Sequence, residues 1–302
     1  MKKAIIWILA VVAALVVVDI VFGYVMKRFT ETKCIGGDYR MSDHVLKADT
    51  VENLLVLGSS VALNSLDTKM MEDSLGVSAY NAGSNGQETP YYLAIAETVI
   101  DRPGLETIIL GVTDYTFTNT GAGSRINFLV PYYKAGYPAI DKCLEKRSAR
   151  DRIMYKSSLY RFNTIWFRIL LYQFVEPGLK GKNGFIAKDI PAFFPKKTVV
   201  EKDDTLTTER RDEFERLISI CKEKNKRLIV CFPPRFEERR LTTSLEKYLQ
   251  KRAAGGDFEL WYDVTASPFS SDSTLFHDSE HINYRGADIY TKMIIERLKK
   301  KS

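Results

Sequence analysis

Short apolar runs alternate with amphipathic segments along the chain from about residue 51. Five runs with few polar residues predict buried strands, at residues 53–58, 77–83, 105–112, 227–232 and 258–264. Apolar residues at helical spacing predict helices near residues 66–75, 90–100, 207–225, 236–252 and 286–301. Alternation of this kind indicates an α/β fold, with a parallel sheet and helices on both faces. Five strands suit a flavodoxin-like order, in which sites form beyond the carboxyl ends of the strands.

A long insertion at about residues 115–205 breaks this alternation after the third predicted strand. Its middle, residues 157–175, is rich in aromatic residues and is predicted to be helical. Such a segment can be a helical subdomain packed on the sheet or a stretch lying near a membrane. It can equally be a lid or a substrate platform, and the sequence leaves these alternatives open.

The first 26 residues contain a stretch apolar enough to cross a membrane. Residues 4–26 follow Lys2 and Lys3 and carry a single charge, at Asp19. About 20 apolar residues match the thickness of the bilayer core. A cleaved signal peptide is the alternative, but its apolar stretch is shorter and ends in a small-residue cleavage site, which this sequence lacks. We therefore predict a retained single-pass transmembrane helix that contacts the bilayer through residues 4–26.

This anchor suggests a division of the chain into three parts: an anchor at 1–28, a linker at 29–50 and the α/β domain at 51–302. Positive charges flank both ends of the apolar stretch, so they do not fix its orientation. A large domain behind an N-terminal anchor is usually exported, and we expect residues 35–302 to be extracytoplasmic. Asp19 would cost about 2.5–3.5 kcal/mol at the centre of the bilayer. It could snorkel or be protonated, or it could meet a polar group of a partner membrane protein.

Composition and charge narrow the function classes. The chain has 302 residues, of which 45% are hydrophobic and 27% charged, which excludes a disordered protein. The net charge of +6 is spread along the chain, and no basic stripe is interleaved with aromatic residues, so no nucleic-acid partner is expected. The four cysteines form no CxxC or Cys/His cluster, and no metal or other cofactor is expected. Their disulfide state is left open.

Polar residues that could carry chemistry follow the predicted strands or precede the last helix. Ser60 comes directly after the first strand, in GSS, where a tight turn is the plain alternative to a nucleophile. Asp278 and His281 lie three residues apart in DSEH, before the last helix. A serine nucleophile needs a base within hydrogen-bond reach and a carboxylate that orients the base. His277 could compete as that base, although His281 has the better-placed carboxylate.

Two further polar blocks follow the second and third strands. NAGSNG supplies Gly86, where a backbone N–H could bind an oxyanion, and GVTD supplies Thr113 and Asp114. Each block alone is an ordinary turn. Their joint occurrence in this order is much harder to explain by turns alone.

The order of these blocks resembles the SGNH (GDSL-type) hydrolase superfamily, over residues 51–118 and 226–298. The resemblance implies Ser60 as nucleophile, His281 as general base, Asp278 as its orienting carboxylate and Gly86 as an oxyanion donor. Two positions depart from the family pattern: Ser59 stands where the family has Asp, and Thr113 stands where it has Asn. With the anchor, the chain is similar to the membrane-anchored envelope branch of DltD-type and alginate O-acetyltransferase-type proteins. Such proteins work beside a membrane-bound O-acyltransferase, which is a candidate partner.

The sequence therefore predicts a membrane-anchored, extracytoplasmic serine esterase or O-acyltransferase that acts on acyl esters of a cell-envelope glycan. The alternative is a non-catalytic protein of the same fold that binds polymer or a membrane O-acyltransferase, and the Thr113 departure favours it. A phosphate-binding domain fits poorly, because neither GxGxxG nor GxxxxGK[ST] follows any strand. The triad requires Ser60 and His281 to lie within roughly 4 Å of each other.

Overall fold

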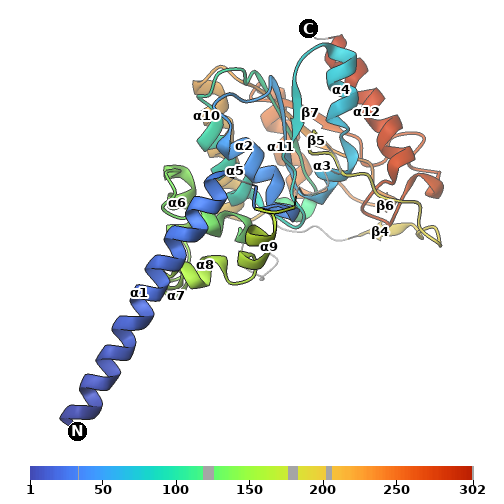
Figure 1. The fold of residues 1–302 in the computed structure, drawn as a ribbon. Helices are drawn as coiled ribbons and strands as arrows, with labels where there is room; N and C mark the ends of the chain where they lie inside the picture. Colours follow the sequence, from blue (N-terminus) through green and yellow to red (C-terminus); the bar gives the residue numbers. More distant parts are fainter. Residues whose placement is uncertain (33, 118–125, 176–182, 202–205, 301–302) are drawn as a thin grey trace. The chain divides into compact units, whose positions relative to one another are not determined.

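The computed structural model describes residues 1–32, 34–117, 126–175, 183–201 and 206–300 (Figure 1). The chain forms two compact units. One contains Met1–His44 and Asn127–Gly178, and the other contains Val45–Ile126 and Leu179–Ser302.

The second unit is built on a five-stranded sheet in which every pair of neighbours is parallel. In spatial order its strands are β2 (Ala79–Asn81), β1 (Leu54–Gly58), β3 (Thr107–Gly111), β5 (Arg227–Phe232) and β7 (Glu259–Tyr262). Numbered along the sheet-forming strands alone, this is the 2-1-3-4-5 order of flavodoxin-like folds. The predicted α/β fold and its strand order are confirmed.

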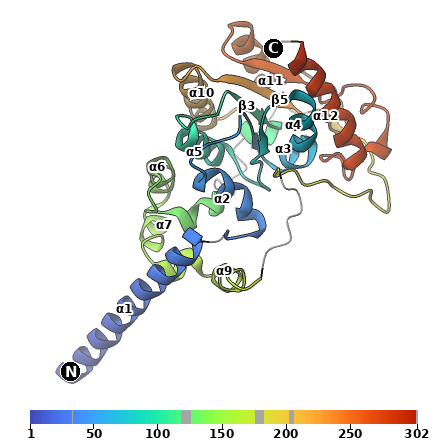
Figure 2. The ribbon, with the colours of Figure 1, turned by 45° about the horizontal axis from the view of Figure 1, so that its top comes forward.

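Helices cover both faces of this sheet (Figures 1 and 2). One face carries α3 (Ser60–Ser65), α4 (Thr68–Leu75) and α12 (Tyr284–Lys299), and the other carries α5 (Thr89–Val99), α10 (Thr208–Glu223) and α11 (Ser244–Ala254). Successive side chains of a strand point to opposite faces. Val56 and Ile109 accordingly share a core with Ile294 of α12. The strand residues next to them in sequence, which point to the other face of the sheet, are also buried. This two-sided burial explains why the strands are continuous apolar runs.

Two glycines at the end of neighbouring strands bring α3 close to the sheet. Gly58 of β1 lies opposite Gly111 of β3. Gly58 has φ +141°, and a Cβ there would lie 2.1 Å from the Gly111 carbonyl oxygen and 2.6 Å from Cβ of Ala62. Only glycine fits this position. The close approach sets the first turn of α3, and with it Ser60, at the carboxyl edge of the sheet.

The predicted helix at 236–252 is wrong in its first half. Residues Glu237–Arg239 form β6, which pairs in parallel with β4 (Thr198–Val200) in a separate two-stranded sheet. The helix α11 starts only after Thr243, whose side chain accepts a hydrogen bond from the backbone N–H of Glu246. This N-cap fixes where the helix begins.

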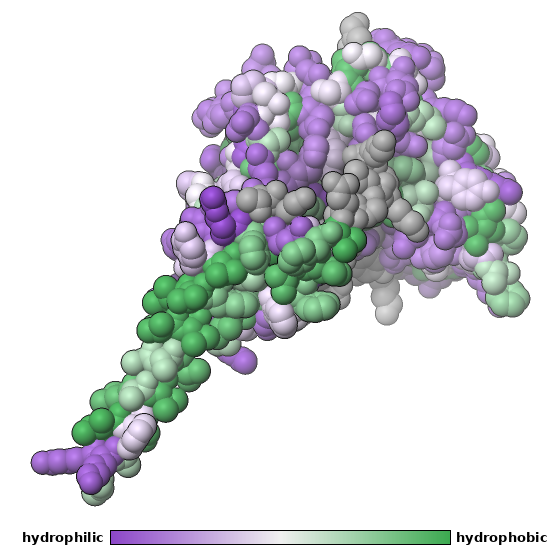
Figure 3. Space-filling model, in the orientation of Figure 1, coloured by the Kyte–Doolittle hydropathy of each residue, from purple (hydrophilic) through white to green (hydrophobic). Residues whose placement is uncertain are grey.

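The first unit is helical and includes the predicted anchor. Its long helix α1 (Lys2–Thr32) has a hydrophobic surface along most of its length (Figure 3). Among the described residues, it is the one helix long and apolar enough to cross a membrane. Its second segment contains the short elements η3 (Asn127–Tyr132), α6 (Pro138–Glu145), α7 (Ala149–Met154), α8 (Ser158–Phe162) and α9 (Trp166–Leu171).

The aromatic stretch at 157–175 forms two short helices rather than one. Ile165 leaves helical geometry, with φ −121°, and buries its side chain, which separates α8 from α9. Within the same unit, Asp19 of α1 accepts hydrogen bonds from the start of α8. The sequence alone suggested that Asp19 snorkels, is protonated or meets a partner protein, whereas its partner in the structure is in its own chain.

Residues 29–50, predicted as a linker, contain regular structure. The end of α1 is followed by η1 (Gly37–Tyr39) and α2 (Arg40–Lys47). In the first unit, Asp43 of α2 accepts hydrogen bonds from the Ile35 N–H and, at 2.6 Å, from the Tyr132 hydroxyl. The boundary between the two compact units falls inside α2. The predicted division at residues 28 and 50 stays a prediction.

Candidate active site

Three predicted residues lie in hydrogen-bond contact at the carboxyl edge of the sheet. Ser60 is the first residue of α3, and its Oγ lies 2.7 Å from Nε2 of His281. Nδ1 of His281 lies 2.9 Å and 3.0 Å from the two carboxylate oxygens of Asp278. This is the geometry expected of a serine nucleophile, its base and the orienting carboxylate. Their catalytic roles stay a prediction.

A short closed loop before α12 presents Asp278 and His281. Phe276 and Ile282 form an antiparallel bridge, and the N–H of His277 donates to the carbonyl of His281 at 2.8 Å. Asn283 then caps α12, because its side chain accepts from the N–H groups of residues 285 and 286. The loop is therefore held at both ends, and the two side chains are fixed by local backbone structure.

The hydrogen bonds around Asp278 set the orientation and tautomer of His281. The Oδ1 atom of Asp278 also accepts from the backbone N–H groups of Glu280 and His281, each at 2.8 Å. An ionised Asp278 makes Nδ1 of His281 the protonated nitrogen, which leaves the lone pair of Nε2 for the Ser60 hydroxyl. Partial burial by itself would raise the pKa of Asp278. The hydrogen bonds from the His281 ring and from Glu280 outweigh it and lower the pKa to about 2.

His277 does not contact Ser60. Its Nδ1 lies 2.9 Å from the backbone carbonyl of Asp189. Residues 276–282 therefore present His281, and not His277, to the serine. The side chain of His281 is 16% exposed and that of Asp278 is 49% exposed, so this site is open to solvent at one side.

The loop that carries Gly86 is tied to the end of β1. The N–H of Ser84 donates to the Gly58 carbonyl at 2.9 Å, two residues before Ser60. Gly86 itself has φ +64°, a conformation that glycine adopts without strain. Its role as an oxyanion donor stays a prediction.

Ser59 stands where the family that the sequence resembles has an aspartate, and it contacts the buried side chain of Tyr92. Its side chain hydrogen-bonds the hydroxyl of Tyr92, and that hydroxyl in turn donates to the carbonyl of Gln87. Burial raises the pKa of Tyr92 above its usual value, so the phenol stays protonated. No sequence signal indicates this contact, because Tyr92 stands in an ordinary apolar helix pattern.

Thr113 and Asp114 lie at the same edge of the sheet, after β3. The N–H of Thr113 donates to Oγ1 of Thr116 at 3.1 Å. Asp114 is buried, and its Oδ2 accepts from Nη1 of Arg239 at 2.9 Å. Asp114 is therefore an ion-pair partner inside the fold, and its predicted binding role stays untested.

Two arginines that the sequence did not single out, the buried Arg235 and the partly buried Arg239, connect this edge to the triad loop. Arg235 lies 3.9 Å from Asp114, and its Nη2 donates to Glu280 at 3.4 Å. Glu237, whose side chain is fully buried, pairs with both Arg235 and Arg239. The N–H of Phe236 also donates to the carbonyl of Ser279 at 3.0 Å. The only signal was the charged run PPRFEERR, which falls in the wrongly predicted half of a helix.

A second missed segment, residues 183–189, runs alongside α3 and the start of α12. The N–H of Asn81 donates to the carbonyl of Asn183 at 2.8 Å, at the outer edge of β2. Further along, Nδ2 of Asn64 donates to the carbonyl of Ile186 at 2.7 Å, and the N–H of Tyr284 donates to the carbonyl of Lys188 at 2.8 Å. The end of the insertion thus packs beside the elements that carry Ser60 and His281.

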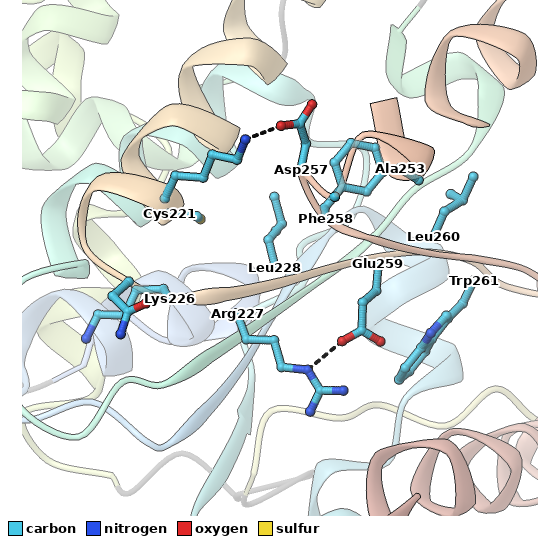
Figure 4. Close-up of a pocket in the computed structure, with 13 residues that line it drawn as sticks. Cys221, Lys226, Arg227, Leu228, Ala253, Asp257, Phe258, Glu259, Leu260 and Trp261 are labelled. Carbon is cyan, nitrogen blue, oxygen red and sulfur yellow. Dashed lines mark hydrogen bonds and ion pairs between the residues drawn. The ribbon is translucent and has the colours of Figure 1, made fainter. Parts of the chain in front are cut away.

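A cavity of about 680 Å³ lies at the opposite, amino ends of β5 and β7 (Figure 4). Two ion pairs line it, Lys222 with Asp257 and Arg227 with Glu259 at 2.7 Å, and Lys226 donates to the backbone carbonyl of Leu105. None of the triad residues lines this cavity.

The described residues include no group of three or more His, Cys, Asp or Glu side chains that could hold a metal ion. Cys221 and Cys231 are buried free thiols. In comparisons with known proteins, no family model and no curated protein matches this chain.

Proposed function

We propose that this chain is a membrane-anchored serine esterase or O-acyltransferase, acting outside the cytoplasm on acyl esters of a cell-envelope glycan. The observation that carries the proposal is the continuous hydrogen-bond chain from Ser60 through His281 to Asp278, with distances of 2.7 Å and 2.9 Å. Those residues come from two segments far apart in the sequence. A chance meeting of a serine, a histidine and an aspartate in this order and orientation is a poor explanation for it.

The reaction follows from the roles of the three side chains. Oγ of Ser60 attacks the ester carbonyl carbon while Nε2 of His281 takes its proton. The tetrahedral intermediate then breaks its bond to the alcohol oxygen, which leaves with the proton returned by His281. The acyl group remains on Ser60. Water or a glycan hydroxyl then attacks the acyl carbon and gives its proton to Nε2 of His281. The bond between this carbon and Oγ of Ser60 breaks, His281 returns the proton to Oγ, and the free acid or the acylated glycan leaves.

The negative charge on the intermediate requires donors beside Ser60. The backbone N–H groups of Ser60 and Gly86 are the proposed donors, and the hydroxyl of Thr113 is a third candidate in place of the family's asparagine. Each such donor is worth about 3–4 kcal/mol of transition-state stabilisation. The tie between Ser84 and the Gly58 carbonyl supports the placement of the Gly86 loop near the serine.

The choice of an envelope glycan rests on the anchor and on the resemblance to SGNH proteins. An apolar helix of 31 residues at the N-terminal end would keep the site close to a membrane surface. The parallel sheet in flavodoxin-like order and the Ser-His-Asp geometry are both what that superfamily implies. The same reasoning keeps a membrane-bound O-acyltransferase as a candidate partner.

A fluorophosphonate probe, which labels activated serines, tests the nucleophile. We expect the wild-type chain to be labelled and the Ser60→Ala variant to be silent. Ser59→Ala is the matched control, because it removes the neighbouring hydroxyl and should still be labelled at Ser60. Labelling that persists in Ser60→Ala would disprove the assignment.

Thr113 stands where the family pattern has Asn, and this difference favours a second candidate function, that of a non-catalytic binding protein of the same fold. An unlabelled wild-type chain that still binds envelope polymer would favour that function. A labelled chain that transfers or hydrolyses acyl groups from acetylated glycan would exclude it.

A further inference from the structure

Asp19 in the apolar helix α1 is satisfied by the first turn of α8. The hydroxyl of Ser157 donates to Oδ1 of Asp19 at 2.7 Å, and the N–H groups of Ser158 and Leu159 donate to its two carboxylate oxygens at 3.0 Å and 2.8 Å. N–H groups at the start of a helix have no partner within the helix, and a carboxylate satisfies them well. Asp19 and α8 are thus held together by three hydrogen bonds.

Packing continues from Asp19 toward the end of α1. A Cβ on Gly23 would lie 2.1 Å from Oγ of Ser158, so only glycine allows this close approach. Phe22 lies one turn after Asp19, and its ring meets that of Phe162 edge to face, with centroids 6.5 Å apart. Met26 is buried, whereas residues 1–18 are all exposed. The contact with α8 and α9 therefore begins at Asp19.

The length of α1 places this contact at membrane depth. A hydrocarbon core of about 30 Å needs about 20 helical residues at 1.5 Å per residue. Counted from Ala4, the first residue after the two lysines, such a span ends near Gly23. The unpacked residues Ala4–Val18 alone would cover only about 22 Å, which is too short. The turn that bears Asp19 and Gly23 therefore lies at the boundary of the hydrocarbon, and α8 lies beside it.

The surface around this contact suits that depth. Large apolar side chains of α8, α9 and the residues after them are exposed: Leu159, Trp166, Phe167, Leu171, Phe174 and Val175. Figure 3 shows the hydrophobic surface of α1 continuing onto the adjoining part of the same unit. Exposed basic residues stand nearby in sequence, at Arg150, Arg152 and Lys156. Aromatic side chains with flanking basic residues are typical of the membrane–water interface.

We propose that α8 and α9 lie in the membrane interface beside α1, with their exposed apolar side chains among the lipid headgroups and upper acyl chains. The occupant of this surface is the lipid bilayer, because the surface is continuous with a helix that itself matches the bilayer. The inference rests on the proposed anchoring by α1. The insertion then has a membrane-embedded part, which fixes the depth and rotation of the anchor through Asp19.

The three tryptophans of the chain, Trp7, Trp166 and Trp261, allow a direct test with the full-length protein. Pairwise replacement by Phe leaves one reporter at a time, in α1, in α9 or in β7. Each variant is reconstituted into vesicles of phosphatidylcholine and phosphatidylglycerol, in which the phosphatidylcholine is either unmodified or brominated in its upper acyl chains. Bromine quenches tryptophan emission only at close range. Trp261, which is buried in the sheet unit, is the control for unspecific quenching.

We expect brominated lipid to lower the emission of Trp7 and of Trp166, and to leave that of Trp261 unchanged. Quenching of Trp7 without quenching of Trp166 would overturn the inference, and would mean that a protein partner or water covers α9. If Trp7 is also unquenched, the anchoring by α1 fails as well. A second measurement, the loss of Trp166 quenching in Phe167→Asp, checks that the apolar face holds α9 in the lipid.

Discussion

Oγ of Ser60 lies 2.7 Å from Nε2 of His281, which follows it by 221 residues in the chain. The contact is held by the packing of the helices that adjoin the two residues. The buried hydroxyl of Thr291 in α12 accepts from the N–H of Asp67 at 3.0 Å and donates to the carbonyl of Ser65 at 3.3 Å. These bonds join α12 to the end of α3. The helix that begins with the serine and the helix that follows the histidine are thus bonded to each other.

The substitution Asp278→Asn should disable the site while keeping its shape. The remaining amide oxygen can still accept from the backbone N–H groups of Glu280 and His281. The amide NH₂, however, would face Nδ1 of His281 and favour the tautomer with a proton on Nε2. That nitrogen could no longer accept the proton of Ser60. We expect kcat/KM for hydrolysis of a p-nitrophenyl ester to fall about 10⁴-fold.

Asp288→Asn is the matched control for this measurement. Asp288 also lies on the C-terminal segment, but it is half-exposed and pairs with Lys292 on the surface of α12. Its loss should leave the rate of ester hydrolysis unchanged. A decrease of less than about tenfold in Asp278→Asn would show that the carboxylate does not orient His281.

Gly58→Ala should destabilise the sheet unit strongly. The new Cβ would lie 2.1 Å from the Gly111 carbonyl oxygen, at a φ of +141° that other residues rarely adopt. Gly76→Ala is the control: its φ is +70°, but no atom lies within 4 Å of the new Cβ. In urea unfolding we expect a loss of roughly 3 kcal/mol or more for Gly58→Ala and about 1 kcal/mol for Gly76→Ala. Equal losses would mean that the contact with Gly111 is unimportant.

The strands and the residues that follow them could be predicted because the pattern there is local. A fully buried parallel strand is a run of apolar residues, and GSS, NAGSNG and GVTD each mark the end of one. DSEH likewise depends on residues close in sequence, since Asp278 and His281 share one tight loop. The fold class followed from such local signals. The expectation that Ser60 meets His281, 221 residues further along, came instead from the family resemblance.

What could not be predicted depends on contacts between distant segments. Nothing near Arg235 or Arg239 in the sequence indicates Asp114, and the charged run around them looks like a solvated helix. Asp19 illustrates the same limit, because its donors lie 138–140 residues away at the start of α8. The helix α8 has only five residues, with no Gly or Pro before it. Nothing in its sequence therefore indicates that its N-terminus binds a distant carboxylate.

Asp114→Ala should show that this carboxylate stabilises the fold. Asp114 is buried and pairs with Arg239 at 2.9 Å. Its removal takes one carboxylate away from Arg235 and Arg239, and Glu237 still pairs with both. Loss of one member of a buried ion pair costs about 3–5 kcal/mol, and we expect a decrease of that size in the free energy of unfolding.

Asp101→Ala is the comparison for this loss. Asp101 pairs with Lys224 at 2.8 Å, but its side chain is 70% exposed. Exposed pairs contribute about 0–1 kcal/mol, so this variant should be nearly as stable as the wild type. If the two aspartates prove equally dispensable for stability, Asp114 is free for the substrate-binding role that the sequence suggested.

The two buried thiols should make the protein less stable at alkaline pH. Burial raises the pKa of Cys221 and of Cys231 to about 12, from an ordinary value of 9.0. Between these values the unfolded chain releases thiol protons that the folded protein keeps. The free energy of unfolding must therefore fall as pH rises through 9. At pH 10 the loss is about 1.4 kcal/mol for each thiol, or about 3 kcal/mol for both.

Urea unfolding at pH 7 and pH 10 measures this loss of stability, with the double variant Cys221→Ala/Cys231→Ala as control. That variant loses packing at every pH but lacks these thiols, so its stability should change less with pH; parallel pH profiles would contradict the burial of the thiols.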